Sequence, residues 1–471
     1  MEATEAVHLG IISLVPATVS VILAFWTRNT VFSLAVACFL GILLSGQGLM
    51  GFPALLKTAL GTTSFSGLLL LELFIGVMIA FFQRTGAIQN VTLMLERRRF
   101  TRVKTQLVAW FLGMFVFFSD YFSPLFVGST MRNLADKARI SREKLAYIAD
   151  STSAPVSVLV PITGWAAYFT GLLIGVGTIA NEADAMSLFL KTIPFNFYAI
   201  LSVLFVGLLA LRVIPEFGPM KKAEKRALEE GKVLRDGADP LMGSELTDTP
   251  PYEGIKTNVF LNFILPVIIV ISIAVGTFMT MKSAKTMEAF LAAAVILGII
   301  MRIQGVPFAD IMKTATAGMK GVMPAILVLA FAFSLNQLSK DMGTAHYIIS
   351  VTEGWLTPHL LPFLIFITCA VTSFATGTSW GTFAIVMPLA APLAFTFSGG
   401  EVSILVVATI AAVAGGGVFG DHCSPLSDTS VLASTGAASD HIDHVKTQLP
   451  YALTVAVISA LLYLVIGFVF V

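Results

Sequence analysis

Long apolar runs separated by short polar turns extend over almost the whole chain. The first six runs, each of spanning or near-spanning length, cover about residues 9–26, 31–46, 67–82, 105–131, 147–178 and 188–211. Six more cover about residues 259–279, 287–301, 323–338, 360–396, 403–435 and 450–471. A helix needs roughly 20 apolar residues to cross a bilayer, and it satisfies its backbone hydrogen bonds within its own segment. The pattern therefore predicts an all-α polytopic membrane protein.

One long polar stretch, residues 212–256, separates the two sets of runs. Its residues 221–230 have the composition of a helix, whereas residues 236–251 contain Asp239-Pro240 and Pro250-Pro251 and are typical of a loop. The stretch is too short to hold a core of its own. We therefore expect a first membrane repeat at 1–211, a linker at 212–256 and a second membrane repeat at 257–471.

Short sequence similarities recur in the same order in the two sets. The segment 56–59 (Leu-Lys-Thr-Ala) resembles 312–315, and 83–87 resembles 340–344, both at a separation of about 256 residues. Further along, Ser-Ala-Pro-Val-Ser at 153–157 resembles Cys-Ser-Pro-Leu-Ser at 423–427. Chance similarity between helices rich in Leu and Ala is the alternative. The shared order favours an internal repeat, which is common in secondary transporters with sites in discontinuous helices.

Most lysine and arginine residues fall on one side of the membrane if the runs 105–131 and 360–396 are re-entrant hairpins, which enter and leave the membrane on the same side. Each half then crosses the membrane five times, so the second repeat is inverted relative to the first. Most basic residues fall on one side: Arg28, the clusters 84–104 and 132–144, the linker, the segment 302–320 and Lys446. The other side receives Lys57, Lys191, Lys282, Lys285 and Lys340. By the positive-inside rule the linker is expected in the cytoplasm and both termini outside, in a bacterial inner (plasma) membrane.

Composition excludes several classes of protein. Of the 471 residues, 56% are hydrophobic and only 12% are charged, whereas soluble domains carry roughly 25% charged residues. The net charge of +1 without a basic stripe gives no support for a nucleic-acid partner. The three cysteines have no metal-ligand spacing, and the chain shows no phosphate loop and no nucleophile elbow. We therefore expect no enzyme activity, no bound cofactor and no ATP-driven transport.

Four polar breaks interrupt the apolar runs, at residues 119–124, 150–155, 376–382 and 421–430. Each break joins small residues to hydroxyl groups, and three of them contain carboxylates. Ionisable groups at membrane depth are costly and normally face a cavity, where they carry function. Irregular backbone at that depth is tolerated where it lines a cavity enclosed by protein. The breaks are therefore predicted to form an ion or substrate site.

Sodium ions are bound by hard oxygen ligands, which unwound carbonyls, hydroxyls and a carboxylate can supply. We expect Asp120, Asp421 and Asp428 to be the cation ligands. A proton can bind the same carboxylates, so Na+ and H+ would compete for them. The remaining expected site residues lie in the same four breaks: Ser123, Asp150, Ser151, Thr152, Ser153, Thr376, Thr378, Ser379, His422, Ser424 and Ser427.

Structural roles are the alternative for several of these residues. Asp120 and Asp428 could cap half-helices, Asp150 could lie near the membrane edge, and His422 could be a buried histidine with satisfied hydrogen bonds. Glu72 could be either a site residue or a packing partner. The motif Asp-His-Ile-Asp-His at 440–444 resembles a metal or proton cluster, but its position before Pro450 favours a solvated loop.

Several of these segments resemble the NhaC-type Na+/H+ antiporter family. They are 420–430, 434–437 and 440–451 near the C-terminus, 374–382 in the second hairpin, and 150–155. The resemblance implies membership of the ion transporter superfamily, with two inverted repeats, re-entrant hairpins, a scaffold part and a moving part, commonly in a homodimer with elevator-like movement. It implies as site residues Thr378, Ser379, Asp421, His422, Ser424, Ser427 and Asp428. The choice of Asp120 rests on the first hairpin itself.

We therefore predict a secondary antiporter that exchanges Na+ for H+. The alternative is a sodium- or proton-coupled carrier of a small organic acid or amino acid, for which Trp380 and the glycines around it could make room. A channel is less favoured because repeats with mid-membrane breaks suit alternating access. Crowding by Trp380, Phe383 and Phe122, and the lack of any lysine or arginine within a break, favour the small cation site.

Overall fold

A computed structural model describes residues 8–27, 29–48, 50–96, 100–117, 119–161, 163–241, 250–281, 285–352 and 357–471. Within these ranges the chain is helical and forms no strand, apart from one isolated bridge between Pro240 and Asp440. The predicted all-α class is confirmed. Arg28, Arg97–Arg99, Lys282 and residues 242–249 of the linker, which the charge argument used, lie outside the described ranges.

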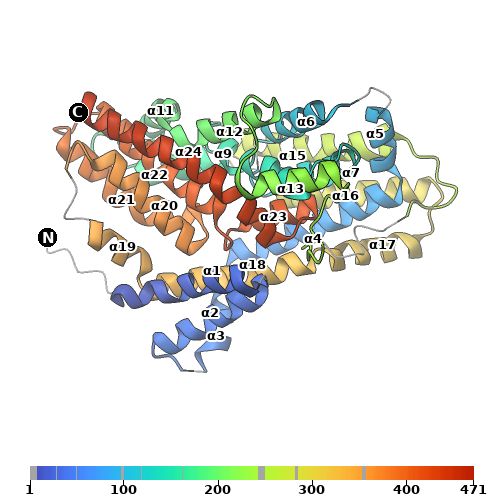
Figure 1. Ribbon diagram of the computed structural model, residues 1–471, viewed down its shortest axis with the longest axis horizontal. Helices are drawn as coiled ribbons and strands as arrows, with labels where there is room; N and C mark the ends of the chain where they lie inside the picture. The colour runs from blue at the N-terminus through green and yellow to red at the C-terminus, as the bar shows by residue number, and fades with distance from the viewer. Residues whose placement is uncertain are drawn as a thin grey trace.

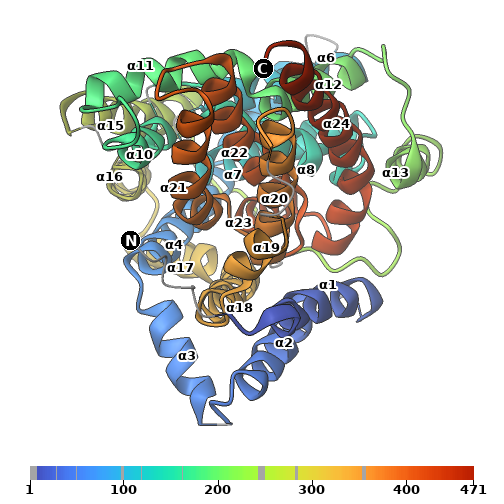
Figure 2. The same ribbon diagram turned by 90° about the vertical axis from the view of Figure 1, so that its left-hand side faces the viewer.

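The helices before the linker follow the predicted runs but are more numerous, because turns and breaks divide the runs. They are η1 (Gly10–Leu14), α1 (Val15–Thr27), α2 (Thr30–Leu44), α3 (Gly51–Leu60), α4 (Thr63–Arg84), α5 (Ala87–Glu96), α6 (Arg102–Phe115), α7 (Phe122–Lys137), α8 (Arg142–Ser151), α9 (Ala154–Ser157), α10 (Gly164–Leu173), α11 (Glu182–Thr192), η2 (Ile193–Phe195) and α12 (Phe197–Ala210). The linker contains α13 (Gly218–Glu229). In Figures 1 and 2, α1, α2 and α3 project from one side of the helical body.

The second half has the same character. Its elements are the π-helical turn η3 (Phe260–Ile264), α15 (Leu265–Met281), α16 (Thr286–Ile303), α17 (Phe308–Gly321), α18 (Met323–Asp341), α19 (Thr344–Thr352), α20 (Leu361–Thr376), α21 (Ser379–Phe397), α22 (Ile404–Cys423), α23 (Asp428–Ala437) and α24 (His441–Val469). Polar side chains that accept a hydrogen bond from the first turn begin many helices of both halves, as helix N-termini require. Examples are Asn29, Thr62, Thr101, Ser141, Ser403, Ser427 and Asp440.

Seven helices of the described chain are long and apolar enough to cross a membrane. An eighth span results if α11 with η2 and α12, which meet at 47°, are counted as one. The spans differ in how much of each is buried within the protein. The segment 404–423 is almost entirely buried, whereas most of 260–281 is not. This arrangement agrees with a polytopic membrane protein in which α22 occupies the centre.

All four predicted breaks separate helices. Between α6 and α7, the described residues 116–117 and 119–121 are not helical, and α8 ends at Ser151 before the short α9. Gly377 ends α20 in the left-handed conformation (φ 69°), and its N–H donates to the Ser373 carbonyl at 2.8 Å. Between α22 and α23, Pro425 cannot donate a hydrogen bond, and Ser424 before it adopts an extended conformation (ψ 138°). In the second half, therefore, a glycine in the left-handed conformation ends one helix, and a proline marks the break between two others.

The two halves contain their elements in a similar order. A short helix precedes a long one in α3–α4 and in α17–α18, and these pairs carry the similar segments 56–59 and 312–315. A helical hairpin follows in each half (α6–α7 and α20–α21), and then a broken helix (α8–α9 and α22–α23). The order agrees with an internal repeat.

The linker helix α13 packs against the beginnings of α8 and α24, at the outer edge of the body (Figure 2). Ion pairs fasten it there: Arg226 contacts Glu143 at 2.9 Å, and Arg102 contacts Glu224. After the helix, Arg235 contacts Asp443 at 2.7 Å in the first turn of α24. The predicted helix at 221–230 is therefore present, and the linker is held to two of the helices that carry site residues.

Candidate functional site

Asp421 lies in the last turn of α22 and faces the start of α21. Both the backbone N–H and the hydroxyl of Ser379 donate to its Oδ2, at 3.2 and 2.5 Å. Ser379 is the first residue of α21, so its N–H is one of the donors that a helix N-terminus leaves unpaired. The side chain of Asp421 is buried, and its Oδ1 has no hydrogen-bond partner among the described residues. One carboxylate oxygen is therefore fixed and the other is free to bind a ligand.

Asp428, from the same break, and Asp120, from the break before α7, lie near Asp421. Asp428 begins α23, and its Oδ2 accepts a hydrogen bond from the Tyr121 hydroxyl at 3.1 Å. Its carboxylate interacts electrostatically with both Asp421 and Asp120. All three side chains are buried, with exposed fractions of 2 to 8%. Because like charges repel strongly where solvent is excluded, such a cluster favours a bound cation or proton.

A cavity of about 860 Å³ opens beside this cluster. Three of the four breaks contribute to its wall, with Tyr121, Thr376, Gly377, Thr378, Leu426 and Asp428. The breaks pack tightly on one another, because a Cβ atom built on Gly377 would lie 2.6 Å from the Leu426 carbonyl oxygen. The cavity therefore gives a ligand a path to Asp428, whereas Asp120 and Asp421 are not part of its wall.

The rest of the cavity wall carries lysines that the sequence argument did not place there. Lys285 at the start of α16 and Lys340 near the end of α18 both line the cavity, and neither forms an ion pair with another described residue. The same wall includes the aromatic rings of Tyr168 and Trp380, 4.6 Å apart. The breaks themselves contain no lysine or arginine, as the sequence shows, but the cavity that they share is lined by two lysines, which weakens the argument for a site that takes only a small cation.

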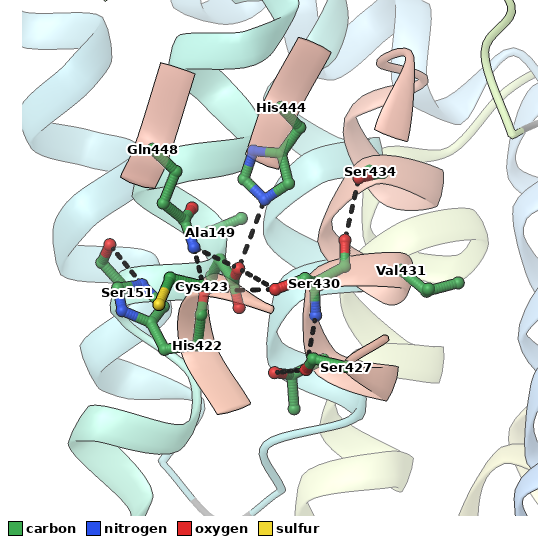
Figure 3. Close-up of polar contacts among 12 residues, drawn as sticks. Ala149, Ser151, His422, Cys423, Ser427, Ser430, Val431, Ser434, His444 and Gln448 are labelled. Carbon is green, nitrogen blue, oxygen red and sulfur yellow. Dashed lines mark hydrogen bonds and ion pairs between the residues drawn. The ribbon is translucent and has the colours of Figure 1, made fainter. Parts of the chain in front are cut away.

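Asp150 forms the centre of a second polar cluster, which is shown in Figure 3. Its Oδ2 accepts hydrogen bonds from Ser430 Oγ at 3.0 Å, Gln448 Nε2 at 2.9 Å and His444 Nε2 at 3.2 Å. These partners come from α23 and α24, while Asp150 itself lies in α8. Asp150, Ser430, His444 and Gln448 are all fully buried. Asp150 is therefore enclosed by protein on all sides and is not exposed to solvent.

His422 joins the two clusters. Its Nε2 lies 2.9 Å from Ser151 Oγ and its Nδ1 lies 2.7 Å from the Tyr198 hydroxyl. Its backbone carbonyl accepts from Gln448 Nε2 and lies 3.1 Å from Ser430 Oγ. The last turn of α22 thus holds Asp421 against α21 and the neighbouring His422 against α8 and α12.

The other expected site residues have structural contacts. Their hydroxyls donate to backbone carbonyls near the breaks: Ser123 to Gly113, Thr152 to Ile148, Ser153 to Asp150, Thr376 to Thr372 and Ser424 to Phe374. Ser427 caps α23 by accepting from the Ser430 N–H at 3.3 Å. Of this group, only Thr376 also lines the cavity. These hydroxyls therefore stabilise the broken backbone, because they satisfy carbonyl groups close to where the helices end.

Residues 440–444 are not a solvated loop, and that interpretation of the sequence was wrong. Asp440 caps α24, and His441 and His444 are buried in its first turns. His441, His444 and Gln448 follow at spacings of three and four, which places them on one face of the helix. That spacing was the signal for the second cluster. Among the described residues, no group of three or more His, Cys, Asp or Glu side chains is arranged to hold a metal ion, and this includes the carboxylates near Asp421, so a cation there would also need hydroxyl or carbonyl oxygens.

Glu72 is also fully buried, in α4. Neither of its carboxylate oxygens has a hydrogen-bond partner among the described residues. It does not belong to the wall of the large cavity, although Leu68 and Leu71 of the same helix do. The structure therefore gives Glu72 no contact with either polar cluster.

Comparison with known proteins gives a consistent set of relatives. Residues 156–468 match the sequence model of the Na+/H+ antiporter family. An uncharacterized protein of Haemophilus influenzae is 31% identical over 488 residues, which cover 97% of this chain and 91% of that protein. The family match includes the breaks at 376–382 and 421–430, and the first two breaks lie before it.

Two shorter matches are to transporters of organic solutes. The malate-2H(+)/Na(+)-lactate antiporter of Bacillus subtilis is 30% identical over 177 residues, 38% of this chain and 36% of that protein. The arginine/ornithine antiporter ArcD of Halobacterium salinarum is 34% identical over 143 residues, 30% of this chain and 28% of that protein.

Proposed function

Because this chain belongs to the Na+/H+ antiporter family, we propose that it exchanges Na+ for H+ at the cluster of Asp120, Asp421 and Asp428. The observation that carries the proposal is the free Oδ1 of Asp421, which is buried near two further carboxylates, one of which, Asp428, lines the cavity. A Na+ ion and a proton each reduce the negative charge of the cluster. Either one therefore stabilises it, and the two compete.

Alternating access at this site is the second part of the proposal. The recurring element order and the four breaks support two inverted repeats that carry a site between them. We propose that each repeat contains a re-entrant hairpin, and that the broken helices move against the rest of the molecule in an elevator-like manner. We also propose that the protein is a homodimer in the bacterial inner membrane.

Proton movement in proteoliposomes tests the proposed exchange. With the purified protein in vesicles that enclose a pH-sensitive dye, an external pulse of Na+ should drive protons out and make the interior alkaline. A pulse of K+ at the same concentration should not. If Na+ gave no proton movement, while an organic acid or amino acid did, the carrier function described next would replace cation exchange.

The cavity supports a second candidate function, a sodium- or proton-coupled carrier of a small organic acid or amino acid. A volume of about 860 Å³ lies within the usual range of small-molecule sites, roughly 300–1,000 Å³, and is far larger than a dehydrated cation needs. The unpaired Lys285 and Lys340 could receive a carboxylate. The printed names of the relatives from Bacillus subtilis and Halobacterium salinarum, which specify organic solutes, support the same candidate.

Replacing both lysines should separate the two candidates. If the cavity binds carboxylates, malate, lactate or an amino acid should raise the melting temperature of the protein, and K285Q/K340Q should lose that effect but keep stabilisation by Na+. The matched control is Lys313→Gln, an exposed lysine of α17 outside the cavity wall. No stabilisation of the native protein by any organic solute, together with saturable stabilisation by Na+, would reject the carrier.

The orientation of the chain is a separate proposal, with the linker in the cytoplasm and both termini outside. Lys225 on α13 is well exposed, with 68% of its side chain accessible, whereas the three native cysteines are buried. An impermeant maleimide should therefore label Lys225→Cys in inverted membrane vesicles and not in intact cells. Labelling from outside intact cells would reverse the proposed orientation.

A further inference from the structure

Glu72 is buried near the middle of α4 without a partner. Its side chain has no exposed surface, and neither carboxylate oxygen has a hydrogen-bond partner among the described residues. The segment 65–84 of this helix is long and apolar enough to cross a membrane. An ionisable group at membrane depth is costly, so it normally carries a function. Because neither polar cluster contacts this carboxyl group, its role is separate from theirs.

Two contacts define how α4 packs against α17. Arg84 at the end of α4 forms an ion pair at 2.9 Å with Asp310 at the start of α17. Two turns away the backbones meet at glycines, because a Cβ atom built on Gly76 would lie 2.5 Å from the Gly318 carbonyl oxygen. The two helices are therefore antiparallel. The same register places Glu72 opposite the junction between α17 and α18, so a charge at this position acts on the packing of both helices against α4.

The helices that pack most closely against α4 offer few ligands for a metal cation. The buried residues of α16 are alanine, phenylalanine, leucine and methionine. Those of α17 include one hydroxyl, Thr314, which donates to the Asp310 carbonyl at 2.8 Å and lies opposite residue 80 in the same register. Hard cations require several oxygen ligands, whereas a proton requires one. A proton is therefore the ligand that suits Glu72.

No charged group balances Glu72 within the described part of the chain. Burial is what acts on its charge, and no other described titratable group interacts with it. An isolated carboxylate in an apolar interior is so unfavourable that the group takes up a proton instead. The described side chains of α5 carry no charge, and the charged residues of the other helices that contact α4 are at least partly exposed. They are Lys57 on α3, Glu288 and Arg302 on α16, Asp310, Lys313 and Lys320 on α17, and Lys340 and Asp341 on α18.

From these observations we infer that Glu72 is a proton-binding site, and that its bound proton stabilises the packing of α4 against α17 and α18. The neutral carboxyl group fits between the helices, whereas loss of the proton leaves an uncompensated charge close to the point where the backbones of α4 and α17 meet. The path to solvent is short, because Leu68 and Leu71, in the turn before Glu72, line the large cavity. The packing of these helices should therefore weaken as the pH rises.

Infrared spectroscopy tests the bound proton, because a protonated carboxyl group and a carboxylate absorb at different frequencies. At neutral pH, the native spectrum minus that of Glu72→Gln should contain a carboxylic acid band, and Na+ in place of K+ should leave this band unchanged. Glu182→Gln is the matched control. Glu182 is exposed in the first turn of α11, so its difference spectrum should contain carboxylate bands. Carboxylate bands for Glu72, or loss of its acid band when Na+ is added, would overturn the inference.

The melting temperature measured across pH tests the effect on packing. That of the native protein should fall by several degrees between neutral and alkaline pH, and most of the fall should be absent in Glu72→Gln, which cannot titrate there. Glu72→Met, which is apolar and of similar size, should behave alike and replaces the glutamine variant in both measurements if that variant does not fold. Glu182→Gln should follow the native curve. Parallel curves for the native protein and the Glu72 variants would overturn the role in packing. Neither measurement requires transport, so this inference and the proposed Na+/H+ exchange can fail independently.

Discussion

Asp421→Asn should abolish Na+-driven proton movement while the protein still folds. The substitution keeps the shape of the side chain, and the amide can still accept a hydrogen bond from Ser379. It removes the charge that a Na+ ion or proton would neutralise. We expect a loss of about a hundredfold or more in both Na+/Na+ and Na+/H+ exchange, the order expected when the charge of a buried ionic site is removed. The measurements are 22Na+ uptake and dye-reported pH changes in the same vesicles.

Asp428→Asn provides the comparison for that experiment. Asp428 begins α23 and faces the cavity, so it could either share the cation or favour the helix N-terminus by its charge. If Asp428 also binds the cation, Asp428→Asn should lose nearly as much transport activity as Asp421→Asn. If its role is confined to the helix, transport should decline only slightly. An Asp421→Asn protein that elutes as a monodisperse peak and exchanges Na+ for H+ at the native rate would exclude Asp421 from the site.

Gly420→Ala should strongly destabilise the protein, which is the second large effect. A Cβ atom at this position would lie 2.4 Å from both the Ala370 carbonyl oxygen and the Phe374 nitrogen, and the backbone of α20 cannot yield as a flexible side chain could. Overpacking of this kind typically costs about 1–3 kcal/mol, and we expect a value at or above the upper end because both obstructing atoms belong to the backbone. The half-inactivation temperature, measured by size-exclusion chromatography after heating, should fall sharply.

Gly171→Ala is the matched control for this effect. Gly171 is an exposed glycine in α10, and a Cβ atom built there meets no atom within 4 Å. Alanine in an exposed helix interior is more favourable than glycine by about 1 kcal/mol, so this variant should be as stable as the native protein or slightly more stable. Equal stability of Gly420→Ala and Gly171→Ala would contradict the close packing of α20 against α22.

The breaks could be predicted from sequence because their signal is local. A carboxylate, a proline or a cluster of glycines inside an apolar run is unfavourable as a continuous membrane helix, so Asp120, Gly377 and Pro425 mark their breaks without any knowledge of the fold. The same reasoning predicted that Asp120 and Asp421 come close together. In the structure both interact with Asp428, which agrees with that expectation.

The features of the site that could not be predicted from the sequence depend on contacts between segments far apart in the chain. Tyr121 and Asp428 are 307 residues apart, and Lys285 and Lys340 lie in helices outside the breaks, so no local pattern assigns them to one cavity. His444 was misinterpreted for a different reason. The position of its motif before Pro450 favoured a loop, but Pro450 lies within α24, and the motif forms the first turns of that helix. The inner side of the helix is buried against Asp150.

The most direct test of the central claim is to locate the bound cation. Crystals of the native protein soaked in Tl+, a monovalent ion with a strong anomalous signal, should show a peak within bonding distance of Asp421 Oδ1, and Na+ should displace it. Crystals of Asp421→Asn should lack that peak. A Tl+ peak at Asp150 instead, or no peak near Asp421 in a preparation that exchanges Na+ for H+, would contradict the assignment of the cation site.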